Sequence, residues 1–198
     1  PQIRITYNAT VKVPSELMAV MSAENPKEKT ADGVYHFKMK QPIPAYLIAL
    51  AVGDIEYKAV SDRTGVYAEK SMIEKVRDEF SEMEKMVAAA ENLYGLYDWE
   101  QFDVIVLPPS FPFGGMENPR LTFANPTRNT VDRSLVTVIA HEFAHSWSGN
   151  LVTNATWDDF WLNEGFTVYF ENRIMESIYG KEVADILALI EFQELVTE

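Results

Sequence analysis

The sequence predicts an α+β fold, in which a β-rich segment precedes a largely helical lobe. Apolar and polar residues alternate over residues 3–13, as in a half-buried strand, whereas apolar residues recur at helical spacing from Ile73 onward. The distribution of charge also differs between the two parts of the chain. Residues 1–60 carry seven basic and six acidic side chains, whereas the remaining residues carry a net charge of −14. We therefore expect one domain over residues 1–54 and a second over residues 55–198.

Further strands are expected in the first segment. Ser22–Asp32 is polar and predicts a loop, while Val34–Lys40 and Ala45–Val52 have the composition of strands. The dipeptide Gly53-Asp54 then gives a turn signal, which agrees with a domain boundary near residue 54.

The second domain opens with a predicted helix. Ser71-Met72-Ile73-Glu74 matches a capping box, a pattern typical of a helix start. A stripe of apolar residues at helical spacing leads from there to Gly95, and it comprises Ile73, Val76, Phe80, Met83 and Val87. Phe102–Leu107 then predicts a buried strand, and Pro108–Pro112 predicts the loop that follows it.

A metal-binding pattern lies in the next predicted helix, over residues 134–147, which Asp132 or Ser134 caps and Gly149 ends. This stretch is apolar on most sides, but it contains His141-Glu142-Phe143-Ala144-His145. Histidines four residues apart share one helix face, so both imidazoles can hold one ion. Ordinary core histidines would be costly here without partners, which favours metal binding.

Glu164 completes the pattern, because it follows His145 after 18 intervening residues. Two histidines and a glutamate are the ligands of catalytic zinc sites that keep a fourth position open. The sequence therefore predicts one Zn²⁺ per chain, held by His141, His145 and Glu164. Glu142 faces away from both histidines and is free to act as a general base on water.

Glu164 precedes another mostly apolar helix, which Gly180 closes. Glu171 lies two turns after Glu164 and so shares its face. We leave two interpretations open for Glu171: a partner of a metal-binding imidazole, or a surface carboxylate. A last helix is expected around Val183–Ile190.

Three separated motifs resemble the zinc aminopeptidase family that includes aminopeptidase N, most closely its leukotriene A(4) hydrolase branch. They are the span from His141 to Glu164, the segment Trp161–Gly165, and the segment Pro108–Pro119 with its Gly-Gly-Met-Glu-Asn core. The motifs occur in the family's order and spacing, and the resemblance extends from about residue 42 to the end.

The resemblance implies a thermolysin-like (gluzincin) catalytic lobe, preceded by the C-terminal part of a β domain. It also implies that Glu117 binds the free α-ammonium of a peptide substrate, a role that suits a desolvated carboxylate. The implied substrate-binding residues are Gly114, Gly115, Met116, Glu117 and Asn118. Leu121–Ala124 corresponds to a short strand that the family uses as an edge to pair with the substrate backbone.

The chain departs from the family because it continues for only 34 residues after Glu164. The family's catalytic tyrosine lies farther downstream, and Tyr169 and Tyr179 do not fit that role. We therefore expect an internal fragment that depends on the remaining domains of a parent protein. On its own, the fragment should be a weak or inactive enzyme.

Composition excludes several classes of function. A net charge of −13 disfavours nucleic acid, and the chain has no 18-residue apolar run that would cross a membrane. The absence of cysteine excludes disulfides and thiolate ligands, and it agrees with a cytoplasmic location.

The combined prediction is a zinc metallo-aminopeptidase that acts on peptides with a free N-terminus. Two alternatives remain: an epoxide hydrolase that acts on a lipid, and a zinc-binding segment without catalytic activity. The sequence does not indicate the preferred substrate side chain.

Overall fold

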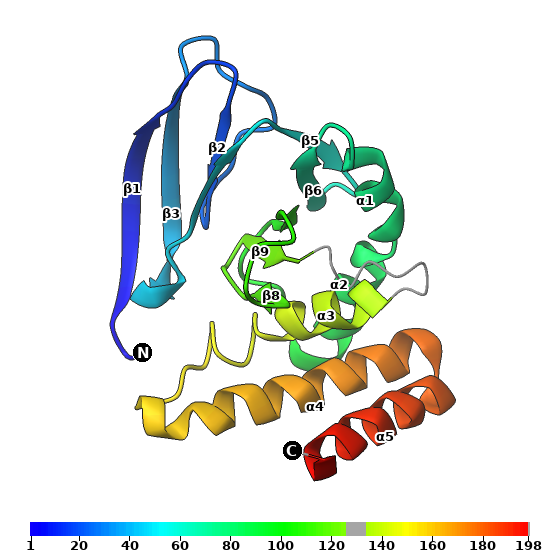
Figure 1. The fold of residues 1–198 in the computed structure, drawn as a ribbon. Helices are drawn as coiled ribbons and strands as arrows, with labels where there is room; N and C mark the ends of the chain where they lie inside the picture. The colour runs from blue at the N-terminus through cyan, green and yellow to red at the C-terminus, as the bar shows by residue number, and fades with distance from the viewer. Residues whose placement is uncertain (126–133, 198) are drawn as a thin grey trace.

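Strands come first and helices dominate the second half of the computed structural model, which describes residues 1–125 and 134–197 (Figure 1). This arrangement confirms the predicted α+β class. None of the helices described in these two ranges combines the length and the apolar character that a membrane crossing requires.

Two small antiparallel sheets form the N-terminal part. Strand β1 (Arg4–Lys12) pairs with β3 (Val34–Pro44), and β2 (Met18–Met21) pairs with β4 (Leu50–Gly53). Alternate residues of β3 are buried, which places its apolar side chains on the core face. Strand β1 confirms the strand predicted over residues 3–13. The sequence analysis did not predict β2, because its four residues are all buried and show no alternation.

The strand predicted over Ala45–Val52 is only partly right. Residues Ala45–Leu47 form a short 3₁₀ turn, η1, and pairing resumes only at Leu50. Pro44 precedes this turn with φ −53°, and Leu47 is fully buried. The fixed φ of proline and the burial of Leu47 favour a turn over a continuous strand.

A five-stranded sheet forms the centre of the second part, in the order β5-β6-β7-β9-β8. Its strands are β5 (Ile55–Ala59), β6 (Thr64–Glu69), β7 (Phe102–Val106), β8 (Gly115–Met116) and β9 (Leu121–Ala124). Strands β6, β7 and β9 are parallel, and both outer strands are antiparallel to their neighbours. The prediction that Leu121–Ala124 is an edge strand is wrong, because β9 pairs on both sides and β8 forms the edge.

Two helices, α1 (Ile73–Glu79) and α2 (Met83–Tyr94), connect β6 to β7, where the sequence predicted one. The capping-box prediction is wrong, because Met72 is the N-cap and no side chain caps the helix. The break follows Phe80, and the turn allows both Phe80 and Met83 to enter the core. The predicted end at Gly95 is confirmed, since Gly95 has φ +98°, a conformation that suits glycine.

The site rests on helices α3 (Ser134–Ala144) and α4 (Phe160–Tyr179), which pack against each other. Helix α3 also contacts β8 and β9, and Phe143 is fully buried against Phe102 of the sheet. Asp132, one of the two predicted caps, lies outside the described residues. The predicted end at Gly149 is too late, because α3 ends at Ala144.

Helix α4 follows a short turn, η3 (Trp157–Asp159), and ends before Gly180 as predicted. The last predicted helix is α5 (Lys181–Thr197), which lies alongside α4 at the base of the molecule (Figure 1).

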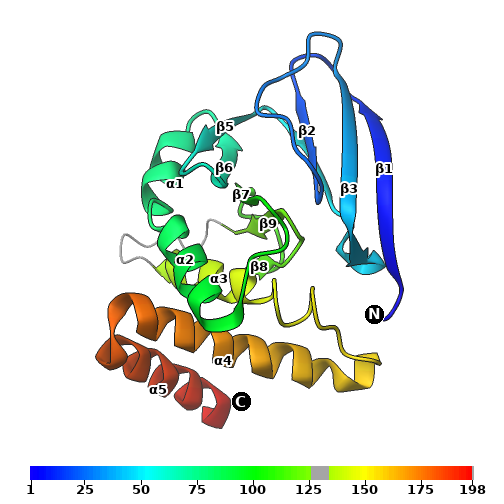
Figure 2. The same cartoon turned by 180° about the vertical axis from the view of Figure 1, so that it is seen from behind.

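The N-terminal strands contact the loop between α3 and α4. The Arg4 guanidinium donates hydrogen bonds to the Leu151 carbonyl (2.8 Å) and the Thr153 hydroxyl (2.7 Å), and Figure 2 shows the N-terminus near this loop.

Candidate functional site

The three side chains predicted to bind metal lie together in the structure. The Nε2 atom of His141 is 3.4 Å from Oε2 of Glu164, and Nε2 of His145 is 3.8 Å from the same oxygen. The three candidate ligand atoms all lie within 4.8 Å of one another. The helix spacing explains the approach of the histidines, whose ring centroids are 4.9 Å apart, and the packing of α4 on α3 brings Glu164 to them.

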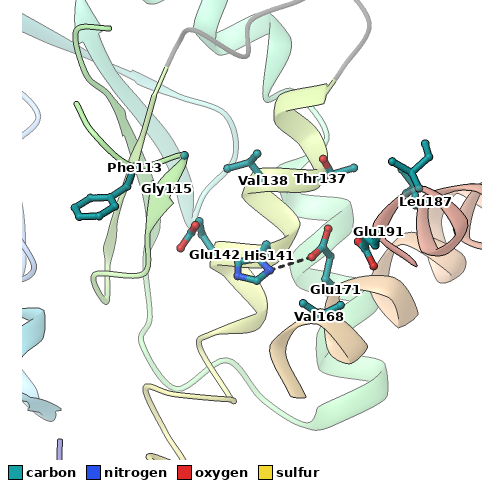
Figure 3. A pocket seen from close by; sticks show the side chains of 12 residues that line it. Phe113, Gly115, Thr137, Val138, His141, Glu142, Val168, Glu171, Leu187 and Glu191 are labelled. Atoms are coloured by element: carbon teal, nitrogen blue, oxygen red, sulfur yellow. Dashed lines mark hydrogen bonds and ion pairs between the residues drawn. The ribbon is translucent and has the colours of Figure 1, made fainter. Parts of the chain in front are cut away.

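Each histidine is oriented by partners at its other ring nitrogen. Nδ1 of His141 lies 3.0 Å from Oε2 of Glu171, a contact marked in Figure 3. Nδ1 of His145 lies 3.0 Å from the Ser148 carbonyl and 3.0 Å from the Thr167 hydroxyl. A proton on each Nδ1 satisfies these acceptors and leaves Nε2 facing Glu164.

Glu171 is 7% exposed, so the interpretation as a surface carboxylate is wrong. The carboxylate contacts a histidine instead, as the other interpretation required. Because Glu171 is on α4 and His141 is on α3, the contact also joins the two helices that form the site.

Charges at this cluster favour a cation. Burial lowers the pKa of His141, but the Glu164 and Glu171 carboxylates outweigh it and raise that pKa to about 10. Burial lowers the pKa of His145. Burial opposes ionisation of Glu164, yet the two neighbouring histidines lower its pKa overall. The carboxylates of Glu164 and Glu171 therefore favour positive charge at His141.

The cluster also fits zinc by geometry. Nitrogen and oxygen ligands lie about 2.0–2.2 Å from tetrahedral zinc, so they are separated from one another by about 3.3–3.6 Å. The separation of 3.4 Å between His141 and Glu164 lies in this range, and that of 3.8 Å between His145 and Glu164 is slightly above it. Two imidazole nitrogens and one carboxylate oxygen are a donor set that zinc accepts readily.

Glu142 lies beside Gly115 of β8 (Figure 3), and one of its carboxylate oxygens is within 4.8 Å of a ring nitrogen of His145. Its side chain fills the space beside Gly115, where an added Cβ would lie 2.2 Å from Oε1 of Glu142. Only glycine fits this close approach of strand to carboxylate. Burial is the main cause that raises the pKa of Glu142, to about 8, so the group can gain and lose a proton near neutral pH.

Glu117 lies beside Glu142 and His145. It is 7% exposed, and its carboxylate lies with Glu142 and His145 in a second group whose candidate ligand atoms are within 4.8 Å of one another. The Asn150 amide holds the backbone by donating to the Glu117 carbonyl at 2.8 Å. The hydroxyl of Tyr46 donates a hydrogen bond to Oε1 of Glu117 at 3.4 Å.

A cavity of about 590 Å³ opens beside these groups. Its lining includes Phe113, Gly114, Gly115, His141, Glu142 and Glu171, and α5 contributes Leu187, Ile190 and Glu191 (Figure 3). Of the remaining predicted substrate-binding residues, Met116 is half-buried in β8 and Asn118 is buried.

The sequence analysis missed two residues at the site. Thr167 contacts His145 from α4, three residues after Glu164, and this position on the helix is a signal that could have identified it. Tyr46 lies far upstream in the chain, in a segment predicted as a strand, and no local pattern linked it to Glu117.

Comparison with known families gives the deciding observation. Residues 79–198 match the model of the peptidase family M1 domain. The chain belongs to peptidase family M1. This confirms the family that the three sequence motifs indicated.

Members of the family with known sequences and structures resemble the chain closely. Leukotriene A-4 hydrolase of Xenopus laevis is 52% identical over 98% of the chain, and aminopeptidase B of Homo sapiens is 49% identical over 91%. The structure of native yeast LTA4 hydrolase matches all of the chain with a TM-score of 0.91 and 43% identity. The chain spans 33%, 28% and 31% of these three proteins, respectively, about a third of their length.

Proposed function

We propose that this chain carries the zinc site, the general base and the amine-binding carboxylate of an aminopeptidase that removes N-terminal residues from peptides. The observation that carries the proposal is the position of two buried carboxylates, Glu117 and Glu142, beside the cluster of His141, His145 and Glu164. One carboxylate can hold a cationic substrate terminus while the other moves a proton.

In this proposal His141, His145 and Glu164 hold one zinc ion per chain. Zinc, when bound, supplies a Lewis acid that polarises the scissile carbonyl and lowers the pKa of water. Glu171, Ser148 and Thr167 orient the two imidazoles through Nδ1.

Glu142 acts as the general base. Its carboxylate removes a proton from the attacking water and then delivers it to the leaving amine. Gly115 permits this role, because any larger residue would displace the Glu142 side chain.

Glu117 fixes the substrate by its N-terminal ammonium, and this contact makes the enzyme an exopeptidase. Gly114 and Gly115 let a peptide approach the backbone closely, and Met116 and Asn118 complete this side of the cleft. Strand β8, as the edge of the sheet, offers unpaired backbone groups that can pair with an extended peptide.

Relatives named aminopeptidase B and leucine aminopeptidase 2 support this function. A second candidate is hydrolysis of a lipid epoxide, and the relative named leukotriene A-4 hydrolase favours it. A non-catalytic, zinc-binding role is the third candidate function.

We further propose that residues 1–54 belong to a β domain distinct from the zinc domain over residues 55–198. We also propose that the protein is cytoplasmic.

The test compares Glu117→Gln with the wild type in the full-length protein that carries this sequence. Activity is measured on amino-acid anilides with a free amine and on their N-acetylated forms. A charged hydrogen bond contributes about 1.5–3 kcal/mol, so we expect about a 10- to 100-fold loss on free-amine substrates and a narrower gap to the acetylated ones. If Glu117→Gln keeps the wild-type preference for free-amine substrates, the ammonium site lies elsewhere. A wild type that cleaves no anilide would favour the epoxide hydrolase or the non-catalytic role.

A further inference from the structure

Tyr46 belongs to the N-terminal strands and turns, over residues 1–53, and its hydroxyl donates a hydrogen bond to the carboxylate of Glu117, beside the zinc cluster. It lies in η1, directly after β3. Two features hold this turn in place: the Ala45 amide donates to the Ile3 carbonyl at 2.9 Å, and Leu47 is fully buried. The position of the tyrosine is therefore set by the N-terminal sheets and not by the lobe that carries the metal ligands.

Two contacts orient the Tyr46 side chain. Its hydroxyl donates to Oε1 of Glu117 at 3.4 Å, and its ring meets Trp157 edge-on, with ring centroids 5.0 Å apart. Trp157 itself begins η3, just before α4. The ring contact thus fixes the direction in which the hydroxyl points, and the hydroxyl points at the carboxylate that we assign to the substrate ammonium.

Tyr46 can act only as a donor in this contact. Burial and the neighbouring Glu117 carboxylate raise the pKa of Tyr46 far above its usual value, so the hydroxyl keeps its proton. Glu117 is 7% exposed and lies close to Glu142 and His145. A buried carboxylate with one fixed hydrogen-bond donor keeps its direction.

We propose that Tyr46 is a positioning residue for substrate recognition: its hydroxyl holds one oxygen of Glu117, and the other oxygen is thereby presented to the N-terminal ammonium of a peptide. The proposal rests on the function proposed for Glu117. It makes the N-terminal strands part of the specificity apparatus, since they carry the donor that aligns the amine-binding carboxylate.

The experiment uses Tyr46→Phe in the full-length protein, because this change removes the hydroxyl and keeps the ring that contacts Trp157. We expect KM for free-amine anilides to rise about 5- to 20-fold with kcat within twofold, the pattern for an interaction made equally in the bound substrate and the transition state. Turnover of N-acetylated anilides, zinc content and thermal stability should not change. Tyr35→Phe is the matched control, because its hydroxyl bonds to the Leu17 carbonyl within the N-terminal part.

A double-mutant cycle with Glu117→Gln separates this proposal from the proposed function. If Tyr46 acts through Glu117, Tyr46→Phe should have no further effect once the carboxylate is gone. One outcome would overturn the role of Tyr46 and leave the proposed function standing: Glu117→Gln loses the preference for free-amine substrates, but Tyr46→Phe has an unchanged KM. An equal effect of Tyr46→Phe on free and acetylated substrates would indicate a structural role and would also overturn it.

Discussion

At the residue scale, His141 near the end of α3 and His145 just after it differ in their surroundings although they lie one turn apart. His141 lies between two carboxylates, Glu164 and Glu171, whereas His145 is bonded at Nδ1 to a carbonyl and a hydroxyl. A carboxylate partner makes an imidazole a stronger donor toward a metal. In the proposed zinc site, the pair would therefore offer one strongly and one weakly polarised nitrogen to the same ion.

His145→Ala should lower zinc content severalfold or more, because removal of one of three protein ligands weakens the site greatly. Metal analysis of the purified protein after dialysis measures the change. His36→Ala is the matched control: His36 is exposed on β3 and bonds only to Thr10 among the described residues, so zinc content should be unchanged. Full retention of zinc by His145→Ala would contradict the ligand assignment.

Glu142→Gln should retain zinc but lose at least about a hundredfold in kcat, the scale of general-base catalysis. The amide has nearly the same shape as the carboxylate, but it cannot accept the proton. Steady-state kinetics of the metal-loaded variant in the full-length protein provide the measurement. Near-normal turnover would show that another group serves as the base.

At the scale of elements, strand β8 and helix α3 form one functional unit. Gly115 on β8 lies against Glu142 on α3, so the position of the edge strand and that of the proposed general base depend on each other. The sequence analysis assigned Gly114 and Gly115 to substrate binding, as the family resemblance implies. The structure adds that the group nearest to Gly115 is a side chain of the protein.

Gly115→Ala tests this contact, because the added methyl group would lie 2.2 Å from Oε1 of Glu142. Either the strand or the carboxylate must shift, so we expect kcat to fall about tenfold or more while zinc content is retained. Gly165→Ala is the matched control, since nothing lies within 4 Å of its added Cβ and alanine suits a helix. Equal activity of the two variants would mean that the position of Glu142 does not depend on the glycine.

At the scale of the whole molecule, a buried acid in the central sheet links stability to pH. Asp103 of β7 is 3% exposed, and the Gln101 amide donates to its Oδ1 at 2.7 Å. Burial raises the pKa of Asp103 to about 7. In the unfolded chain its pKa is about 3.9, so between these values only the folded protein holds the proton.

Stability should therefore fall as pH rises from about 4 to about 7, by up to about 1.4 kcal/mol for each pH unit from this group. Its contribution is complete below the unfolded-state pKa and is lost above the folded-state pKa. In Asp103→Asn the decline should be smaller, because the amide does not titrate. Denaturant unfolding across this pH range measures the slopes, and Asp62→Asn, at an exposed position, controls for the loss of one negative charge. Identical slopes in Asp103→Asn and the wild type would exclude the effect.

The sequence by itself determined the family, the α+β class and which three side chains, His141, His145 and Glu164, come together. It could do so because a metal site on helices has a fixed spacing, and because long periodic segments record which face is buried. Short elements escaped: β2, β8 and η1 are too brief for a period, and the break at Phe80 depends on packing in the core.

Only the tertiary structure decided which strand is the sheet edge, that Glu171 is bound to His141, and that Tyr46 reaches Glu117. Each of these depends on contacts between segments far apart in the chain. Such contacts follow from the order of strands and the packing of helices, and local sequence carries no record of them.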